Sequence, residues 1–323
     1  MKFLVIGAMG SMGQRRIGCL RQLGHDWVGY DIKTDENEPK EIFEVDGWFN
    51  ATPPHFHWHY FDRSTTIPQF IEASVIPSGV GAYGDLEDAS LVYPSCTMRF
   101  HPIVNQIRDQ VKNTNPLAFT YHVGNFLLDW HPEEDYRQKY FAKKATGGCR
   151  EIVCFENEWL VWAFGKAEVI SAYHGKLSGL EMDADDYYAY TLKFDSGIIG
   201  NIVVDVLSRP PCREFKLIYE GHSQYYDLQH IRWDDVYLDE TRAFVEAVQG
   251  KRKWEYSVKD DLENLELLEE IERGRDGGCL VLRGDDAKRF HEYDERSLTD
   301  AEKKELREAH EFYKQHVVKD DKE

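Results

Sequence analysis

The sequence predicts an α/β domain with a parallel sheet, followed by an α+β domain with a large, mostly antiparallel sheet. In the first hundred residues, short apolar runs alternate with turns, and the first run leads through glycines into a helical pattern. After residue 165 the pattern changes to long alternating segments, two of which flank the hairpin turn Asp195-Ser196-Gly197. The first pattern is typical of βα units and the second of antiparallel strands. We expect a dinucleotide-binding domain over 1–98, a substrate and oligomerisation domain over 99–275, and a charged C-terminal extension with a helix over 276–323.

The most informative segment is the glycine-rich turn Gly7-Ala8-Met9-Gly10-Ser11-Met12-Gly13, which follows the apolar run 3–6. Gly10 would let the backbone approach a pyrophosphate, and Gly13 would let the helix lie close to the strand. The helix N-terminus would offer free N–H groups to the phosphates. Ala8 stands where the first glycine of the usual dinucleotide-binding fingerprint is expected. The alternative to a nucleotide site is a tight βα turn that binds no ligand. An apolar strand before the turn, a helix after it and an acidic residue at the end of the next strand together favour nucleotide binding.

That acid is Asp31, which ends the second strand 18 residues after Gly13. A carboxylate at this point accepts hydrogen bonds from the adenosine ribose and repels a 2′-phosphate. The sequence therefore predicts NAD as the cofactor, with NADP disfavoured.

Composition limits the class of protein. With 323 residues, 42% of them hydrophobic, the chain can fill two cores, and its net charge of −19 argues against nucleic acid and anionic membranes as partners. No apolar stretch reaches 18 residues and no signal peptide precedes the first strand, so we expect a cytoplasmic protein. The cysteines form no CxxC pair, which disfavours a zinc site or a disulfide framework. They are Cys19, Cys96, Cys149, Cys154, Cys212 and Cys279.

Periodicity predicts the remaining elements in order. Short strands are expected at 47–51, 69–71 and 91–93, and longer ones at 117–123, 169–177, 187–194, 198–206 and 214–219. Helices are expected at 101–112, 150–164, 238–249, 262–271 and 299–315. We expect the helices at 238–249 and 262–271 to close the second domain.

Several motifs follow the glycine-rich turn in a fixed order. They are Ala51-Thr52-Pro53-Pro54-His55-Phe56-His57, Met98-Arg99-Phe100-His101-Pro102, Tyr121-His122-Val123-Gly124, the segment 129–137 (DWHPEEDYR), Gly147-Gly148 and the hairpin at 195–197. In this order the chain resembles the Gfo/Idh/MocA family (glucose-fructose oxidoreductase, inositol dehydrogenase, rhizopine catabolism) across most of residues 1–275. The resemblance implies a Rossmann domain, a second domain whose open sheet face supports homo-oligomers, and nicotinamide-dependent oxidation or reduction of a sugar-like, cyclitol or nucleotide-sugar substrate.

The chain departs from the family where the family carries its acid–base groups. The usual Glu-Lys-Pro reads Glu72-Ala73-Ser74, and the Asp and His on the helix after the Gly-Gly pair correspond to Ile152 and Phe155. A proton-transfer group is worth about 10²–10⁴-fold in rate. Two interpretations stay open: an active enzyme whose acid–base group has moved to the region of His131 or Lys144, or a catalytically degenerate cofactor- or sugar-binding or regulatory protein. Only 15 residues separate Asp31 from the strand at Gly47, so the nucleotide domain is expected to be trimmed.

The expected site residues follow from the turn, the resemblance and the polar, aromatic segment 129–137. For the cofactor they are Gly7, Ala8, Gly10, Ser11, Met12, Gly13, Asp31, Ala51, Thr52, Pro53, His57 and Glu72. For the substrate they are Arg99, His101, Asp129, His131, Tyr136 and Lys143, with His131 and Lys144 as catalytic candidates. The competing interpretations are structural: an ion pair of Arg99 with Asp85 or Glu87, a turn capped by His131, and surface charges at Lys143 and Lys144. No metal is expected, because His55, His57 and His59 lack a further ligand.

Overall fold

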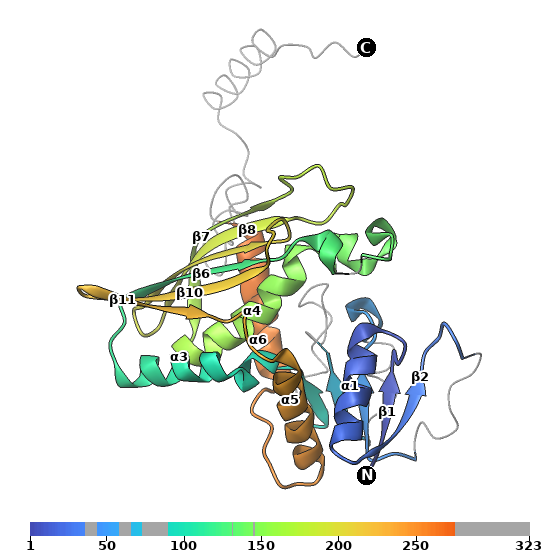
Figure 1. Ribbon diagram of the computed structural model, residues 1–323. Coiled ribbons are helices and arrows are strands. Elements are labelled where there is room, and N and C mark those ends of the chain that lie inside the picture. The colour runs from blue at the N-terminus through green and yellow to red at the C-terminus, as the bar shows by residue number, and fades with distance from the viewer. Residues whose placement is uncertain (36–43, 58–65, 73–89, 131, 145, 275–323) are drawn as a thin grey trace, which may run out of the picture. The chain divides into compact units, whose positions relative to one another are not determined.

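A computed structural model describes residues 1–35, 44–57, 66–72, 90–130, 132–144 and 146–274 (Figure 1). The described residues form two sheets with helices packed against them, so the predicted fold class is confirmed. The strands of the first sheet are β1 (Lys2–Ile6), β2 (Asp26–Tyr30), β3 (Gly47–Asn50), β4 (Gln69–Ile71) and β5 (Val92–Pro94). Those of the second are β6 (Ala118–Gly124), β7 (Ala167–Gly175), β8 (Tyr187–Phe194), β9 (Ile199–Asp205), β10 (Cys212–Tyr219) and β11 (His222–Asp227). The helices are α1 (Ser11–Gln22), α3 (Pro102–Asn113), α4 (Cys149–Phe164), α5 (Trp233–Val248) and α6 (Val258–Arg273).

The first sheet is parallel throughout, with the strand order β2-β1-β3-β4-β5. The central strands β1, β3 and β4 are short runs buried on both faces, whereas the edge strands β2 and β5 are only partly buried. Side chains alternate between the two faces along each strand. Phe3 and Val5 face one core, and Leu4 and Ile6 face the other. The carboxyl ends of β1, β3 and β4 lead directly into the residues of the candidate site.

Helix α5 corrects one expectation about the second domain. It packs against α1 and the first sheet, where the Phe244 ring lies 5.0 Å from Phe49 and 5.4 Å from Phe70, measured between centroids. An amphipathic pattern identifies the apolar face of a helix but not the surface that the face covers. Only α6 packs where expected, against α4 and β7.

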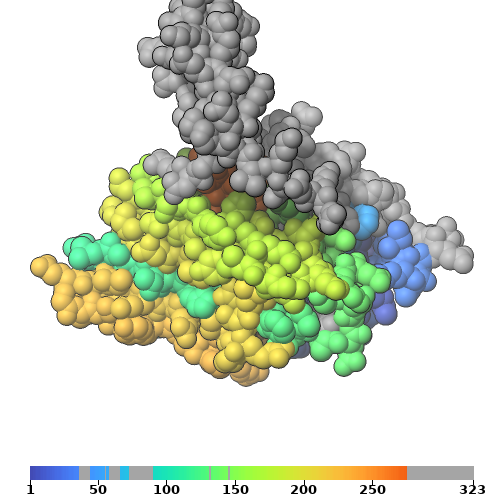
Figure 2. Space-filling view, turned by 90° about the horizontal axis from the view of Figure 1, so that it is seen from above, coloured from blue at the N-terminus to red at the C-terminus, as the bar shows by residue number. Residues whose placement is uncertain are grey.

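The second sheet has the order β11-β10-β6-β9-β8-β7, and all its pairs are antiparallel except β6 with β9. The predicted strands are present, and β11 was missed because its sequence, HSQYYD, is largely polar. Helices α4 and α6 lie against one face (Figure 1). Figure 2 shows the side of the molecule with the other face of this sheet. Residues of β6, β8, β9, β10 and β11 line a groove of about 850 Å³ on that face.

None of the described helices combines the length and apolar character needed to cross a lipid bilayer.

Candidate functional site

The glycine-rich turn is held against the ends of β2 and β3. The N–H groups of Gly7 and Ala8 donate to the carbonyl oxygen of Tyr30 at 2.8 and 3.1 Å. Gly7 has a φ of 79°, and a Cβ placed on it would lie 2.6 Å from the oxygen of Ala51. A Cβ on Gly13 would lie 2.2 Å from the oxygen of Gly7, so close packing of α1 on the strand requires this glycine.

Helix α1 begins at Ser11, and the preceding Gly10 is its N-cap, which contributes no side-chain hydrogen bond. The first N–H groups of a helix have no partner within it, and the helix dipole makes this end favourable for anions. The turn and the helix N-terminus therefore form a cradle suited to phosphate groups.

Asp31 lies beside this cradle and is largely buried. Its carboxylate accepts hydrogen bonds from the N–H groups of Met9 and Lys33, both at 3.0 Å. Met9 and Ile32 are exposed apolar side chains, 59% and 76% accessible, and line the same cavity as Asp31. This arrangement offers a carboxylate for ribose hydroxyls and apolar surface for a flat base.

The cradle opens into a cavity of about 770 Å³, which we call the main cavity. A volume of this size lies within the range of ligand sites, about 300–1,000 Å³. Most of the predicted cofactor residues line it, while Ala8 and Gly13 shape the turn behind it. Those that line it are Gly7, Gly10, Ser11, Met12, Asp31, Ala51, Thr52, Pro53, His57 and Glu72.

The segment after β3 is fixed by side-chain hydrogen bonds. Thr52 Oγ1 donates to Asn50 Oδ1 at 2.7 Å, and His57 Nε2 lies 2.9 Å from the carbonyl oxygen of Thr52. His57 is 1% exposed, and its ring holds the turn closed. The backbone at Thr52 and Pro53 is therefore a rigid wall of the main cavity.

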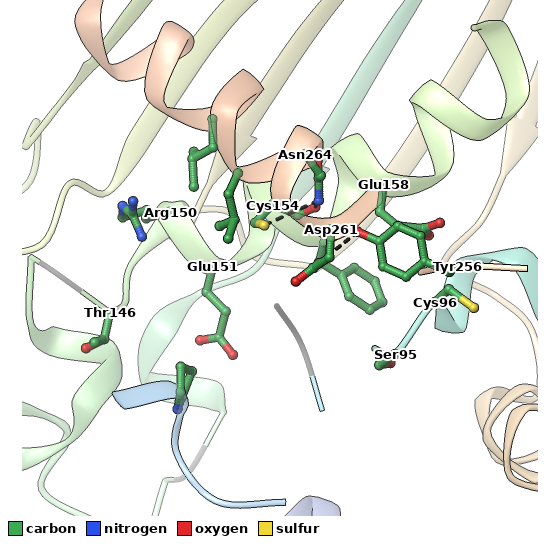
Figure 3. Close-up of a pocket in the computed structure, with 14 residues that line it drawn as sticks. Ser95, Cys96, Thr146, Arg150, Glu151, Cys154, Glu158, Tyr256, Asp261 and Asn264 are labelled. Carbon is green, nitrogen blue, oxygen red and sulfur yellow. Dashed lines mark hydrogen bonds between the residues drawn. The ribbon is translucent and has the colours of Figure 1, made fainter. Parts of the chain in front are cut away.

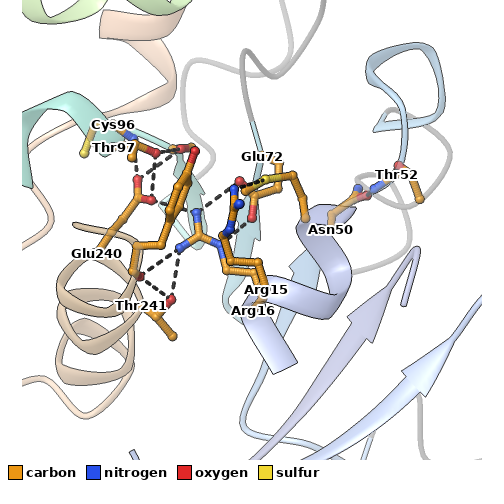
Figure 4. Close-up of polar contacts among 12 residues, drawn as sticks. Arg15, Arg16, Asn50, Thr52, Glu72, Cys96, Thr97, Glu240 and Thr241 are labelled. Carbon is orange, nitrogen blue, oxygen red and sulfur yellow. Dashed lines mark hydrogen bonds and ion pairs between the residues drawn. The ribbon is translucent and has the colours of Figure 1, made fainter. Parts of the chain in front are cut away.

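Glu72, at the end of β4, belongs to a buried charge network (Figure 4). Arg16 lies between two carboxylates: it pairs with Glu72 through Nε and Nη2 and with Glu240 through Nη2 at 2.6 Å. Burial disfavours the charge of Arg16, but the two carboxylates raise its pKa, and burial raises the pKa of Glu72 despite Arg16. The network links α1 and β4 to α5 behind the cavity wall.

Two predicted substrate residues have structural roles instead. Arg99 pairs with Glu158 and donates from Nη1 to the carbonyl oxygen of Glu255 at 3.2 Å, and it does not line the main cavity. His101 is fully buried, and its Nδ1 accepts from the N–H of Ile103 at 3.1 Å as the N-cap of α3. Burial lowers the pKa of His101 to about 4. The motif that contains both residues thus builds the core.

The other predicted substrate and catalytic residues lie off the main cavity or outside the described residues. Asp129 pairs with Arg209, and the Tyr136 hydroxyl accepts from the N–H of Glu181 at 3.0 Å. Lys143 and Lys144 are exposed and do not line the cavity. His131 and Ala73 fall outside the described residues. From this part of the chain the cavity is lined instead by Glu134, Gln138, Lys139, Tyr140 and Phe141.

Sequence reasoning missed Glu151, which lies in the first turn of α4. Glu151 and Phe155, one turn apart on the same helix face, line the main cavity, while Ile152 belongs to the core. Glu151 Oε1 accepts from the Tyr140 hydroxyl at 3.3 Å, and Oε2 has no hydrogen-bond partner among the described residues. Burial raises the pKa of Glu151 to about 7. A residue of the cavity lining therefore carries a carboxyl group whose pKa lies near neutral pH, with its Oε2 buried.

A smaller pocket adjoins the main cavity between α4 and α6 (Figure 3), and we call it the inner pocket. Its volume is about 40 Å³, and it shares Pro54, Ser95, Glu151 and Phe155 with the lining of the main cavity. Glu158, also on α4, lines only the inner pocket, and burial raises its pKa to about 7 against the effect of Arg99.

No set of three or more His, Cys, Asp or Glu side chains in the described part of the chain is arranged to hold a metal ion.

No protein-family model and no curated protein sequence matches this chain. Solved structures do match its fold. A myo-inositol dehydrogenase from Corynebacterium glutamicum has a TM-score of 0.69 at 15% identity, covering 86% of this chain and 99% of its own. GenD2 from gentamicin A biosynthesis, in complex with NAD, has a TM-score of 0.70 at 16% identity, covering 84% and 93%. Levoglucosan dehydrogenase, in complex with NADH, has a TM-score of 0.70 at 12% identity, covering 84% and 96%. The resemblance to Gfo/Idh/MocA-type dehydrogenases is thereby confirmed at the level of the fold.

Proposed function

We propose that this protein is an NAD-dependent oxidoreductase that acts on a hydroxyl or keto group of a sugar-like, cyclitol or nucleotide-sugar substrate. The observation that carries the proposal is the position of Glu151. Its unpartnered Oε2 and near-neutral pKa occur in the same cavity as the phosphate cradle at Gly10 and the carboxylate of Asp31.

The residues present fit a dinucleotide. Gly7 and Gly13 stand where a Cβ would collide with backbone, so the turn packs closely against the end of β3 and against α1, while Gly10 and Ser11 at the N-terminus of α1 line the main cavity. Asp31 would receive the ribose hydroxyls and disfavour a 2′-phosphate, which supports NAD over NADP. Two of the structural neighbours are complexes with NAD and NADH.

A bound nicotinamide supplies the hydride acceptor or donor, and Glu151 supplies the proton exchange. In the oxidation direction Oε2 of Glu151 accepts the hydroxyl proton while the hydride leaves carbon, and in the reduction direction it returns that proton to the carbonyl oxygen. A pKa near 7 allows both roles at neutral pH. The Tyr140 hydroxyl orients the carboxyl group through Oε1, and Phe155 covers it from the same helix face. Glu151 thus replaces both His131 and Lys144 as our acid–base candidate.

The test is hydride transfer by the purified chain with NAD and a panel of sugars, cyclitols and nucleotide sugars, followed by nicotinamide absorbance. We expect kcat/KM for oxidation to rise through about pH 7 and then level off, because the carboxylate is the active form. Glu151→Gln should lower kcat by about 10²–10⁴-fold and leave the Kd for NAD unchanged. Glu168→Gln, an exposed carboxylate on β7, is the matched control and should be neutral.

Full activity in Glu151→Gln would refute the role of Glu151. NAD binding without turnover of any panel member would refute the oxidoreductase and favour the alternative interpretation, a cofactor- or sugar-binding protein without a redox step.

A further inference from the structure

The thiol of Cys212 and the imidazole of His122 lie next to each other in the second sheet, and neither lines the main cavity. Cys212 begins β10 opposite Gly124 of β6, and His122 lies two residues before Gly124. Residues two apart on a strand point to the same face, so the two side chains are diagonal neighbours. Sγ of Cys212 lies 3.7 Å from Nδ1 of His122. A nucleophile and a proton acceptor are therefore in hydrogen-bond contact outside the site described above.

The carboxylate of Asp205, at the end of β9, fixes which nitrogen of His122 carries the proton. Oδ2 of Asp205 lies 2.7 Å from Nε2 of His122, and Oδ1 accepts from the N–H groups of Leu207 and Ser208 at 2.9 and 2.7 Å. Burial raises the pKa of Asp205, but these hydrogen bonds outweigh burial and hold it below its usual value. An ionised carboxylate only accepts, so neutral His122 carries its proton on Nε2 and turns the lone pair of Nδ1 to the thiol.

The thiol of Cys212 is partly exposed, and 40% of the His122 side chain is exposed beside it. The other cysteines in the described part of the chain are buried; they are Cys19, Cys96, Cys149 and Cys154. Burial raises the pKa of the Cys212 thiol, and the carboxylates of Glu214 and Asp205 raise it further. The thiol is therefore protonated at neutral pH, and its sulfur becomes a nucleophile only when a base takes the proton.

The charges of the adjoining groove determine which reactants approach the thiol. His122 and Asp205 line the groove of about 850 Å³ on the open face of the sheet, together with Glu214, Asp227 and Lys216. The Lys216 ammonium lies 5.2 Å from the ring centroid of Tyr225, which also lines the groove. Among the described lining residues three carboxylates thus accompany one ammonium group. This balance favours cations over anions.

We propose that Cys212 is a site of thiol–disulfide exchange with a small cationic disulfide, with His122 as the base and Asp205 as the residue that positions it. Sγ attacks one sulfur of the reactant while the thiol proton passes to Nδ1 of His122. The S–S bond of the reactant breaks, and the departing thiolate takes the proton from His122. The products are a mixed disulfide at Cys212 and one free thiol, so the reaction needs no further oxidant. It is independent of Glu151 and of hydride transfer.

The test follows mixed-disulfide formation at pH 7 by mass spectrometry of the full chain and of its peptides. The protein is kept dilute, because a second copy over this face would cover the thiol. The probes are cystamine (cationic), bis(2-hydroxyethyl) disulfide (neutral) and 3,3′-dithiodipropionate (anionic), each rate being divided by that of the same probe with 2-mercaptoethanol. We expect modification at Cys212 first, with cystamine faster than the anionic probe by about 10-fold or more. Earlier modification of another cysteine, or a cystamine rate no higher than the anionic one, would overturn the proposal.

Variants separate the base from a merely structural role of the imidazole. Cys212→Ser should abolish the reaction, and His122→Gln should slow it at pH 7 by about 10-fold or more. The loss in His122→Gln should shrink as the pH rises, because a thiol that ionises unaided needs no base. His222→Gln, at an exposed histidine that begins β11, is the matched control and should react at the natural rate.

Asp205→Asn tests the positioning residue. The amide donates where the carboxylate accepted, so the proton of His122 moves to Nδ1 and the base is lost. We expect this variant to slow the exchange as His122→Gln does, and the double variant to be no slower than His122→Gln alone. A natural rate in His122→Gln at pH 7, or a loss that persists unchanged at high pH, would refute the role of His122 and with it the proposal.

Discussion

Arg16 and Glu72 form an ion pair behind the wall of the main cavity, with Nη2 of Arg16 donating to Oε2 of Glu72 at 3.0 Å. Because Arg16 is fully buried and also pairs with Glu240, one guanidinium holds two carboxylates from β4 and α5 beside α1. The position of Glu72 at the cavity is therefore set by Arg16, a residue that does not itself line the cavity.

Replacement of Arg16 should be strongly destabilising. Arg16→Met leaves two buried carboxylates without their cation, and breaking a buried pair in this way costs about 3–5 kcal/mol. Arg21→Met, at an exposed position near the end of the same helix, should cost about 1 kcal/mol or less. Urea unfolding of both variants measures the difference, and similar values for the two would show that the network contributes nothing specific.

The buried carboxyl group of Glu151 should make the stability depend on pH. Burial raises its folded-state pKa to about 7, whereas an unfolded glutamate titrates near about 4.3. The stabilisation from the protonated form is therefore present below about pH 4 and is lost as the pH rises through 7. Glu151→Gln, which cannot ionise, should gain about 2 kcal/mol relative to the natural chain between pH 5 and pH 8. Unfolding free energies at the two pH values test this, with Glu168→Gln as a pH-independent control.

The sequence predicts a part of the site when the residues that contact it are close along the chain or lie at the ends of adjacent strands. The turn at Gly7 and Gly13 and the acid at Asp31 could be predicted because their contacts are local or lie at adjacent strand ends. The strands of the second sheet other than β11 could be predicted from alternation, whereas the largely polar sequence of β11 gave no such signal. The partner of α5 could not, because the apolar face of Phe244 would suit either core.

The rotation of α4 decides which of its side chains reach the cavity, since successive residues of a helix are turned by about 100°. Helix α4 begins at Cys149 after Gly148, whose φ is 63°. With this start Glu151 and Phe155 line the main cavity, while Ile152 packs in the core. Of the two positions where the resemblance places Asp and His, only Phe155 therefore lines the cavity, and the sequence motif alone could not supply this rotation. Arg99 was assigned to substrate for a related reason: its partner Glu158 lies 59 residues away.

Two glycines of α1 should respond oppositely to alanine. A Cβ on Gly13 would lie 2.2 Å from the backbone oxygen of Gly7, whereas nothing lies within 4 Å of a Cβ on Gly18. Gly13→Ala should lower stability by about 1–3 kcal/mol and abolish NAD binding by shifting the turn. Gly18→Ala should raise stability by about 0.5–1 kcal/mol, because alanine favours helix, and should leave binding intact. Thermal unfolding with and without NAD distinguishes them, and tolerance of Gly13→Ala would contradict the close packing.

Asp31 should decide between the two nicotinamide cofactors. Its carboxylate would repel a 2′-phosphate, so we expect NAD to bind at least about 10-fold more tightly than NADP, equal to about 1.4 kcal/mol. Asp31→Ser should weaken NAD and improve NADP, because a hydroxyl neither repels the phosphate nor holds two ribose hydroxyls. Asp26→Asn, an exposed carboxylate at the start of β2, controls for the change in net charge. Fluorescence titration with both cofactors gives the ratio, and an unchanged ratio in Asp31→Ser would place the 2′ position elsewhere.

The open face of the second sheet should mediate self-association. Val203 and Asn201 of β9 lie on this face, along the groove of about 850 Å³ that the strands form (Figure 2). Since α4 and α6 cover only the opposite face, we expect two copies to pair here as a dimer or as part of a tetramer. Val203→Arg places a long charged side chain within the contact and should shift the protein to a monomer in light scattering after size-exclusion chromatography. Lys112→Glu, on α3, should leave the assembly unchanged. A natural chain that is already monomeric at working concentration, or a Val203→Arg variant that assembles normally, would exclude this face as the interface.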